Sequence, residues 1–287
     1  MVFSPKMKRS SQETLRYPWA YSRAIKCRVI IVVGMHRSGT GLVSRILQNM
    51  GVFMGRELTG NEESVFFLNL NKEALDIIGC NWRCFDYLPA VCDFGERYRW
   101  MIGFVKRRLE AGLIKFHFGF SALRLFFKQR CIWGWKDPRN SLLLPVWREL
   151  FPKALVVHVF RDGRDVALSL LKRDLKRERG KRQMSVQDQR QRYLDYFKLW
   201  EDYIRRIEST EKAYGPLYPL RFEDLLESTN TVITNLAKAV GVKEQNYLQS
   251  VSVEVDRRRQ GRYREEEFSW AEKATPPSLI LEELGYR

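Results

Sequence analysis

Cysteine and histidine are scarce in this sequence, and their arrangement forms no metal or redox motif. The 287 residues include five cysteines and three histidines, and no two cysteines stand in a Cys-x-x-Cys pair. Zinc ligands and redox-active thiols often come in such pairs, so we expect no metal site. The simplest interpretation is a reduced cytoplasmic compartment, and a Cys80–Cys92 disulfide in an oxidising compartment is the alternative.

Long hydrophobic runs are also missing. No segment reaches the ~18 consecutive apolar residues of a membrane-spanning helix, and residues 1–26 hold no apolar stretch of signal-peptide length. The sequence therefore predicts a cytoplasmic protein. Association with the surface of an anionic membrane stays open as an alternative, because it needs no spanning helix.

Acidic residues are few relative to basic ones. The chain has 34 Asp and Glu against 50 Lys and Arg, which gives a formal net charge of +16. Such an excess favours an anionic partner, which could be a nucleotide, a nucleic acid, an acidic glycan or an anionic membrane. No nucleic-acid recognition motif is present, so we expect no nucleic-acid partner.

Apolar runs alternate with helical patterns along most of the chain. The β-branched and aromatic runs predict strands over 27–33, 131–136, 154–160 and 217–222. Helical spacing predicts helices over 40–50, 62–78, 100–129, 140–150, 163–179, 185–213 and 229–240. Gly112 or Gly119 could break the long 100–129 stretch. This order is typical of a P-loop-containing three-layer α/β/α fold with a central parallel sheet.

The composition also suggests how the chain is divided. Residues 1–24 are polar and basic, and we expect them to form a flexible arm. Residues 25–287 are expected to form a single domain. Within that domain, residues 80–129 are rich in aromatic side chains and stand out as an insertion. A lid helix that packs on the sheet is the plainer interpretation of this insertion.

The stretch GMHRSGTG, residues 34–41, follows the first predicted strand. A glycine-bracketed loop between a strand and a helix presents backbone N–H groups to an anion. Gly34 and Gly39 have the spacing of a nucleotide-hydrolase loop, but Thr40 and Gly41 follow where that pattern has Lys and Ser or Thr. No predicted strand ends in the aspartate that commonly holds magnesium in such enzymes. We therefore expect N–H donors and cations alone to bind the anion.

Two further loops are expected at the same edge of the sheet, because ligands of parallel sheets bind beyond the carboxyl ends of the strands. In WKDPRN, Lys136 ends a strand, and a solvated lysine is the alternative to a functional one. In FRDGRDVALS, Arg161 ends a strand and Ser169 lies two helical turns on, so the two could hold a second phosphate. The basic residues of this helix favour a solvated face: Lys172, Arg173, Lys176, Arg177 and Arg179.

Together, GMHRSGTG and FRDGRDVALS resemble the sulfotransferases that use 3′-phosphoadenosine 5′-phosphosulfate (PAPS). WKDPR and the later RFEDL, residues 221–225, resemble the branch that includes bacterial and tyrosylprotein sulfotransferases. The likeness runs in order over about residues 28–240, with its specific motifs in these loops. It implies transfer of a sulfuryl group from PAPS to an acceptor hydroxyl without a metal, leaving adenosine 3′,5′-bisphosphate.

The resemblance also assigns roles to individual residues. The first loop would bind the 5′-phosphosulfate, and Arg161 and Ser169 would bind the 3′-phosphate. The implied donor-binding residues of the first loop are His36, Arg37, Ser38, Gly39, Thr40 and Gly41. Arg37 and Lys136 would stabilise charge on the bridging oxygen as it leaves. Gly41 departs from the family pattern, which commonly has Ser or Thr there. Asp256–Arg262 resembles the family's basic, glycine-containing 3′-phosphate loop, and an exposed basic tail is the alternative.

An acceptor hydroxyl needs a general base, and the histidines are not well placed for that role. His158 lies within a predicted strand and favours a core position, and His117 lies in the aromatic helix. Glu62 and Glu63 lie where several related enzymes carry a catalytic glutamate. Carboxylates that only stabilise a helix N-terminus are the alternative.

The acceptor is the least defined element of the prediction. Aromatic and basic side chains over 80–129 favour a carbohydrate or glycolipid, with peripheral membrane contact. Two other functions stay open. A magnesium-dependent P-loop kinase or NTPase is disfavoured by Thr40-Gly41, and a non-catalytic binder of polyanions or nucleic acids is permitted by the net charge.

Overall fold

The computed structural model describes residues 18–86, 88, 95–119, 125–126, 131–178, 184–242, 260–264 and 268–286. The first 17 residues of the predicted arm and Cys92 of the alternative disulfide lie outside this set. The arm prediction is wrong for residues 18–24, because helix α1 (Pro18–Lys26) begins at Pro18. Ala20 and Ala24 of α1 are fully buried, so this helix is packed on the domain.

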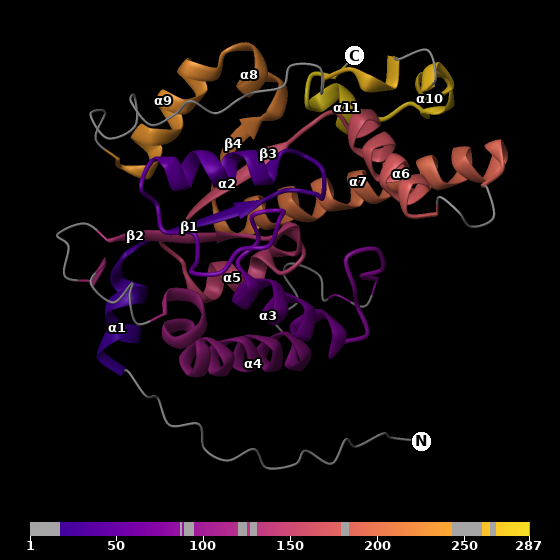
Figure 1. Cartoon of the computed structure of the whole chain (residues 1–287). Helices are drawn as coiled ribbons and strands as arrows, with labels where there is room; N and C mark the ends of the chain where they lie inside the picture. Colours follow the sequence, from indigo (N-terminus) through magenta and orange to yellow (C-terminus); the bar gives the residue numbers. More distant parts are fainter. Residues whose placement is uncertain are drawn as a thin grey trace, which may run out of the picture.

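Four parallel strands form the sheet in the order β2-β1-β3-β4 (Figure 1). They are β1 (Arg28–Val33), β2 (Ile132–Lys136), β3 (Leu155–Phe160) and β4 (Tyr218–Arg221), as the apolar runs predict. In the register, Val32 pairs with Lys136, Val33 with His158, and Phe160 with Arg221. The carboxyl ends of all four strands therefore lie at one edge.

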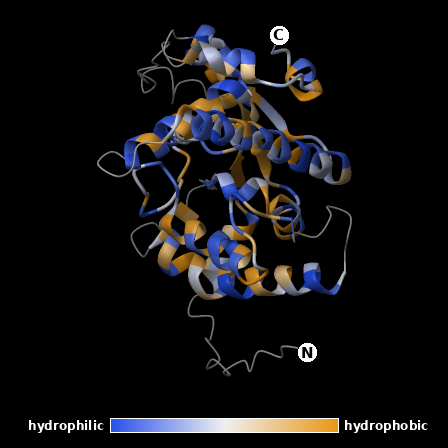
Figure 2. Ribbon diagram, turned by 90° about the vertical axis from the view of Figure 1, so that its right-hand side faces the viewer, coloured by the Kyte–Doolittle hydropathy of each residue, from blue (hydrophilic) through white to orange (hydrophobic). Residues whose placement is uncertain are grey.

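Helices cover both faces of the sheet, which makes three layers (Figure 1). One face packs α2 (Thr40–Asn49), α8 (Phe222–Glu227) and α9 (Thr229–Val240) against Ile30 and Val32. The other face packs the remaining large helices against Val29, Ile31 and Val33. Because β1 is apolar on both faces, neither can be left in water. In Figure 2 the strands accordingly show hydrophobic colours, and the helices around them mix hydrophilic and hydrophobic colours.

The helices on the second face match most of the predicted segments. They are α3 (Val65–Asp76), α4 (Glu96–Gly112), α5 (Leu144–Leu150), α6 (Gly163–Glu178) and α7 (Val186–Tyr214). Pro145 stands in the first turn of α5, and a 3₁₀ turn, η3 (Pro138–Ser141), precedes it. Ser185 caps α7 by accepting a hydrogen bond from the Asp188 N–H.

Helix α4 is shorter than the predicted 100–129 helix. It continues as a π-helical segment, η1 (Leu113–Phe118), and ends at Gly119, whose φ of 69° favours glycine. Tyr98, Met101 and Val105 are buried, so this helix packs on the domain. Trp100 and Phe116 are exposed.

The C-terminal segment adds structure that the sequence did not predict. It contains a 3₁₀ turn, η6 (Arg262–Arg264), and helices α10 (Ser269–Ala274) and α11 (Leu279–Glu283). Tyr263, Phe268 and Tyr286 are buried, and the Tyr286 hydroxyl donates to Glu223 Oε2 over 2.7 Å. In the part of the chain that the structure describes, no helix combines the length and apolar character needed to cross a membrane.

Candidate active site

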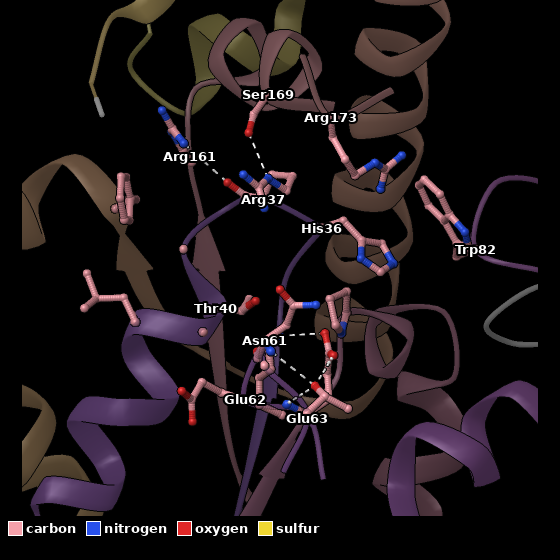
Figure 3. A pocket seen from close by; sticks show the side chains of 18 of the residues that line it. His36, Arg37, Thr40, Asn61, Glu62, Glu63, Trp82, Arg161, Ser169 and Arg173 are labelled. Carbon is pink, nitrogen blue, oxygen red and sulfur yellow. Dashed lines mark hydrogen bonds and ion pairs between the residues drawn. The ribbon is translucent and has the colours of Figure 1, made fainter. Parts of the chain in front are cut away.

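A cavity of about 1140 Å³ opens at the carboxyl edge of the sheet. Each strand contributes to its lining. Arg37 comes from the loop after β1, Lys136 from the end of β2, Arg161 from the residue after β3, and Phe222 from the residue after β4. The predicted convergence of the three sequence loops on one place is therefore confirmed (Figure 3).

The loop after β1 has a backbone that most side chains would not permit. Gly34 has a φ of 140°, and a Cβ there would lie 2.2 Å from the Val159 carbonyl oxygen. Gly39 has a φ of 94°, and a Cβ there would lie 2.2 Å from the Phe222 ring. These two glycines let the loop turn tightly against β3 and α8. The N-terminus of α2 at Thr40 then faces the cavity.

Arg37 contacts both residues that were predicted to bind the 3′-phosphate, although Arg37 itself was predicted to bind the 5′-phosphosulfate. Its Nε donates to Ser169 Oγ over 2.8 Å. Arg161 Nη1 lies 3.4 Å from the Arg37 carbonyl oxygen, to which it donates. Arg37 itself has a φ of 74°, which is uncommon for a residue with a side chain. The structure thus brings Arg37, Arg161 and Ser169 together at one end of the cavity (Figure 3).

Arg161 is fixed by Asp165, a residue that the sequence reasoning did not single out. Arg161 Nη2 donates to the buried Asp165 Oδ2 over 2.9 Å. The same oxygen accepts from the Gly261 N–H at 2.8 Å, and Oδ1 accepts from the Tyr263 N–H at 3.3 Å. Asp165 therefore connects α6 to residues 260–264, and Arg262 of that segment lines the cavity. Residues 256–259 of the predicted phosphate loop lie outside the described set.

Glu63 lies at the other end of the cavity (Figure 3), where it forms a buried ion pair with Lys136. Lys136 Nζ donates to Glu63 Oε1 over 2.9 Å and to the Asn61 carbonyl oxygen over 2.8 Å. Only 3% of the Lys136 side chain is exposed, so the alternative of a solvated loop lysine is wrong. Thr59 Oγ1 donates to the other carboxylate oxygen of Glu63 over 2.7 Å.

Glu62 lines the same cavity but takes a different direction from Glu63 (Figure 3). Its Oε2 accepts a hydrogen bond from Gln48 Nε2 over 2.9 Å, and Arg45 lies 3.7 Å from its Oε1. Both partners belong to α2. Its φ of 65° turns the chain so that adjacent carboxylates point to different neighbours. Neither glutamate lies within a helix, because α3 begins at Val65.

Gly41, which stands where the family commonly has Ser or Thr, lies close to the backbone of Asn61. A Cβ at this position would lie 3.3 Å from the Asn61 carbonyl oxygen, which is closer than most such contacts. That oxygen is the one that accepts from Lys136. The glycine therefore lets the 59–63 segment approach the start of α2 and present Asn61 to the lysine.

His36 and Trp82 lie beside the same cavity (Figure 3). Their ring centroids are 4.6 Å apart, with an interplanar angle of 59°. Burial, together with the nearby Arg139 and Lys136, lowers the pKa of His36 well below its usual value. Its imidazole is therefore neutral at neutral pH, and its Nε2 is buried without a hydrogen-bond partner among the described residues.

The other two histidines are structural, as the sequence predicts for His158. His158 is buried in β3, and burial lowers its pKa to about 4. His117 is fully buried, its Nδ1 lies 2.9 Å from Ser64 Oγ, and burial lowers its pKa to about 3. Both side chains lie outside the cavity lining.

Helix α6 is only in part the solvated basic face that its charge pattern favours. Lys172, Arg173 and Arg177 line the cavity, whereas Lys176 is exposed outside it. Arg179 lies outside the described residues. Helical spacing predicts which residues share a face, but it cannot say that this face turns toward a cavity.

Among the described residues, no group of three or more His, Cys, Asp or Glu could hold a metal ion.

Comparison with known proteins identifies the family of this chain independently of the site. A family model described as "Sulfotransferase family" matches residues 29–246, which is most of the chain. No curated protein matches at a significant level.

Two similar solved structures are the sulfotransferase domain from the curacin biosynthetic pathway and a sulfotransferase from Mycobacterium tuberculosis. The first has a TM-score of 0.51 at 14% identity and covers 91% of this chain and 98% of that one. The second has a TM-score of 0.49 at 14% identity and covers 90% of this chain and 78% of that one. The first likeness supports the fold, and the family match over residues 29–246 shows that this chain belongs to the sulfotransferase family.

Proposed function

We propose that the protein transfers a sulfuryl group from PAPS to an acceptor hydroxyl by metal-independent, in-line transfer. The observation that carries the proposal is the arrangement of Arg37, Lys136, Arg161 and Ser169 around one cavity. A sulfuryl group carries less charge than a γ-phosphoryl group, so cations and N–H donors can surround its oxygens without a bridging metal.

The donor would lie across the three loops. The backbone N–H groups of residues 37–41, with Arg37, Ser38 and Thr40, would hold the 5′-phosphosulfate at the start of α2. His36 would border this group. Arg161 and Ser169 would hold the 3′-phosphate, with Asp165 keeping the Arg161 guanidinium in place. The hydrogen bond between Arg37 Nε and Ser169 Oγ would give way to bonds with the donor.

The transfer forms one bond and breaks another at sulfur. The acceptor oxygen bonds to sulfur while the bond between sulfur and the bridging oxygen of the donor breaks. The electron pair of that bond passes to the bridging oxygen, where Arg37 and Lys136 would stabilise the developing charge. The acceptor proton would pass to a carboxylate. The predicted pair supplies the two candidates for this base, Glu63 beside Lys136 and Glu62 beside Arg45.

The acceptor would be a carbohydrate or a glycolipid. The partly exposed Trp82 ring beside the cavity supports this choice, because aromatic rings stack on sugar faces. Peripheral contact with an anionic membrane from the cytoplasm would suit a glycolipid. Exposed Trp100 and Phe116 on the 96–118 helical segment support such contact, as do its exposed basic residues Arg97, Arg99, Lys106 and Arg107.

The test is calorimetric titration with adenosine 3′,5′-bisphosphate in the presence of EDTA. We expect binding by the wild type and its loss in an Arg161→Ala/Ser169→Ala double variant. Lys176→Gln, on the same helix but outside the cavity, should bind normally. Absence of binding by the folded wild type would refute the donor assignment. Magnesium-dependent ATP turnover would then support a kinase or NTPase, and salt-sensitive nucleic-acid binding would support a polyanion binder.

A further inference from the structure

We propose that the acceptor carries an oxyanion next to its sugar or lipid hydroxyl, and that Arg173 and Lys72 recognise this group beside Trp82. This inference rests on the proposed function, because it assigns one part of the cavity to the donor and another to the acceptor. The oxyanion could be a carboxylate, a sulfate or a phosphate, since a guanidinium and an ammonium bind all three.

The cavity is lined by many more cations than carboxylates. Among the described residues, ten Lys and Arg side chains line it against three carboxylates, Glu62, Glu63 and Asp165. Asp137 and Asp174 stand behind two of the cations as ion-pair partners. PAPS carries about four negative charges at neutral pH, from its two phosphates and its sulfate. The position of each remaining cation therefore decides whether it meets the donor or the acceptor.

Two of these cations lie apart from the predicted 3′-phosphate site. Arg161 and Ser169 occupy one end of the cavity, and Arg173 lies beside Trp82 and His36 on another side (Figure 3). Lys72 projects into the cavity from α3, one turn after Leu68, which also lines it. Lys72 is exposed and has no hydrogen-bond or ion-pair partner in the described part of the chain.

Arg173 is held in a fixed orientation that leaves donors available. Its Nε and Nη2 donate to Asp174 Oδ1 over 3.1 and 2.9 Å, whereas its Nη1 has no hydrogen-bond partner among the described residues. Its guanidinium carbon lies 5.2 Å from the centroid of the Trp82 ring. A cation positioned in advance loses little conformational entropy when an anion binds.

Asp174 also fixes the segment that carries Trp82. Arg83 Nη2 donates to Asp174 Oδ2 over 3.3 Å and to the Tyr196 hydroxyl over 2.7 Å. The Arg83 guanidinium in turn lies 4.7 Å from the Trp82 ring centroid. Tyr196 donates to Asp174 as well. One buried carboxylate on α6 therefore holds the aromatic surface and the neighbouring cation together, as a site that binds a ring with an attached anion requires.

The test compares sugars that differ only in one substituent. D-glucose, D-glucuronate, D-glucose 6-sulfate and D-glucose 6-phosphate would be titrated into the protein saturated with adenosine 3′,5′-bisphosphate, and binding followed by ligand-observed NMR. We expect at least one anionic sugar to bind about tenfold more tightly than glucose, and its identity distinguishes the three oxyanions. Arg173→Gln and Lys72→Gln should each remove most of this preference, whereas Lys176→Gln should keep it.

Several results would overturn the inference. Equal binding of all four sugars, or binding of none, would do so. A preference that survives in both Arg173→Gln and Lys72→Gln would also do so. Lys72→Gln keeps the test valid if Arg173→Gln fails to fold, because Lys72 has no partner to lose among the described residues. If adenosine 3′,5′-bisphosphate binds and the sugars show no preference, only this inference fails. If the bisphosphate itself does not bind, the proposed function fails first.

Discussion

The pairing of Lys136 with Glu63 has consequences for stability as well as for chemistry. Both side chains are almost fully buried, and Lys136 Nζ lies 2.9 Å from Glu63 Oε1. We expect Lys136→Met to lower the free energy of unfolding by about 3 kcal/mol, because Glu63 is left as an uncompensated buried charge. Urea denaturation would measure the loss.

Two variants separate this cause from a packing defect. The double variant Lys136→Met/Glu63→Gln should recover part of the lost stability, because no buried charge is left. Arg108 and Glu73 form an exposed pair with Nε and Oε2 3.0 Å apart, and Arg108→Met should cost under about 1 kcal/mol. A double variant less stable than the Lys136→Met single variant would contradict the explanation.

Among the elements, the loop after β1 depends most on its backbone. We expect Gly34→Ala to lower the free energy of unfolding by at least about 2 kcal/mol, because the new Cβ would meet the Val159 carbonyl oxygen of β3. Backbone in a central strand cannot move aside as a side chain could. Thermal or urea unfolding would show the loss.

Gly60 provides the comparison within the same cavity. Its φ is not in the left-handed region, and a Cβ there would meet nothing within 4 Å. Gly60→Ala should therefore change stability by less than about 0.5 kcal/mol. If the two alanine variants unfold at the same urea concentration, the close approach of Gly34 to β3 is not what restricts that position.

The sequence predicts the elements and residue pairs that a pattern within a few neighbouring residues can reveal. Apolar runs predicted the four strands, and Arg161 and Ser169 were recognised as a pair from their spacing, eight residues apart. The partner of Lys136 is 73 positions away in the chain, so no local pattern could reveal it. Trp82 was one of many aromatic residues between 80 and 129, and only the fold shows that its ring borders the cavity.

At the scale of the whole molecule, the sheet explains why these distant residues meet. Its strands are parallel and in register, so each delivers its next residue to the same edge. The net charge of +16 is concentrated in part at that edge, where ten Lys and Arg side chains of the described residues line one cavity. Composition could predict an anionic partner, but only the topology could say where that partner binds.

The buried histidines make the stability of the whole molecule depend on pH. His158 and His117 have pKa values of about 4 and about 3 in the fold, against 6.5 ordinarily. Below pH 6.5 the unfolded chain therefore binds more protons than the folded one, and stability falls as the pH falls. At pH 5.5, each histidine should cost about 1 kcal/mol relative to neutral pH.

His158→Gln isolates one of these contributions. Burial raises the pKa of Asp137 and Glu223, and such carboxyls oppose the histidines, so the difference between variant and wild type is the quantity to measure. Urea unfolding at pH 7.5 and pH 5.5 should show a loss on acidification that is smaller in His158→Gln by about 1 kcal/mol. The absolute stability of the variant does not matter, because any packing defect is the same at both pH values. Equal losses in the two proteins would mean that His158 takes up a proton without unfolding, and its burial in β3 would not control its charge.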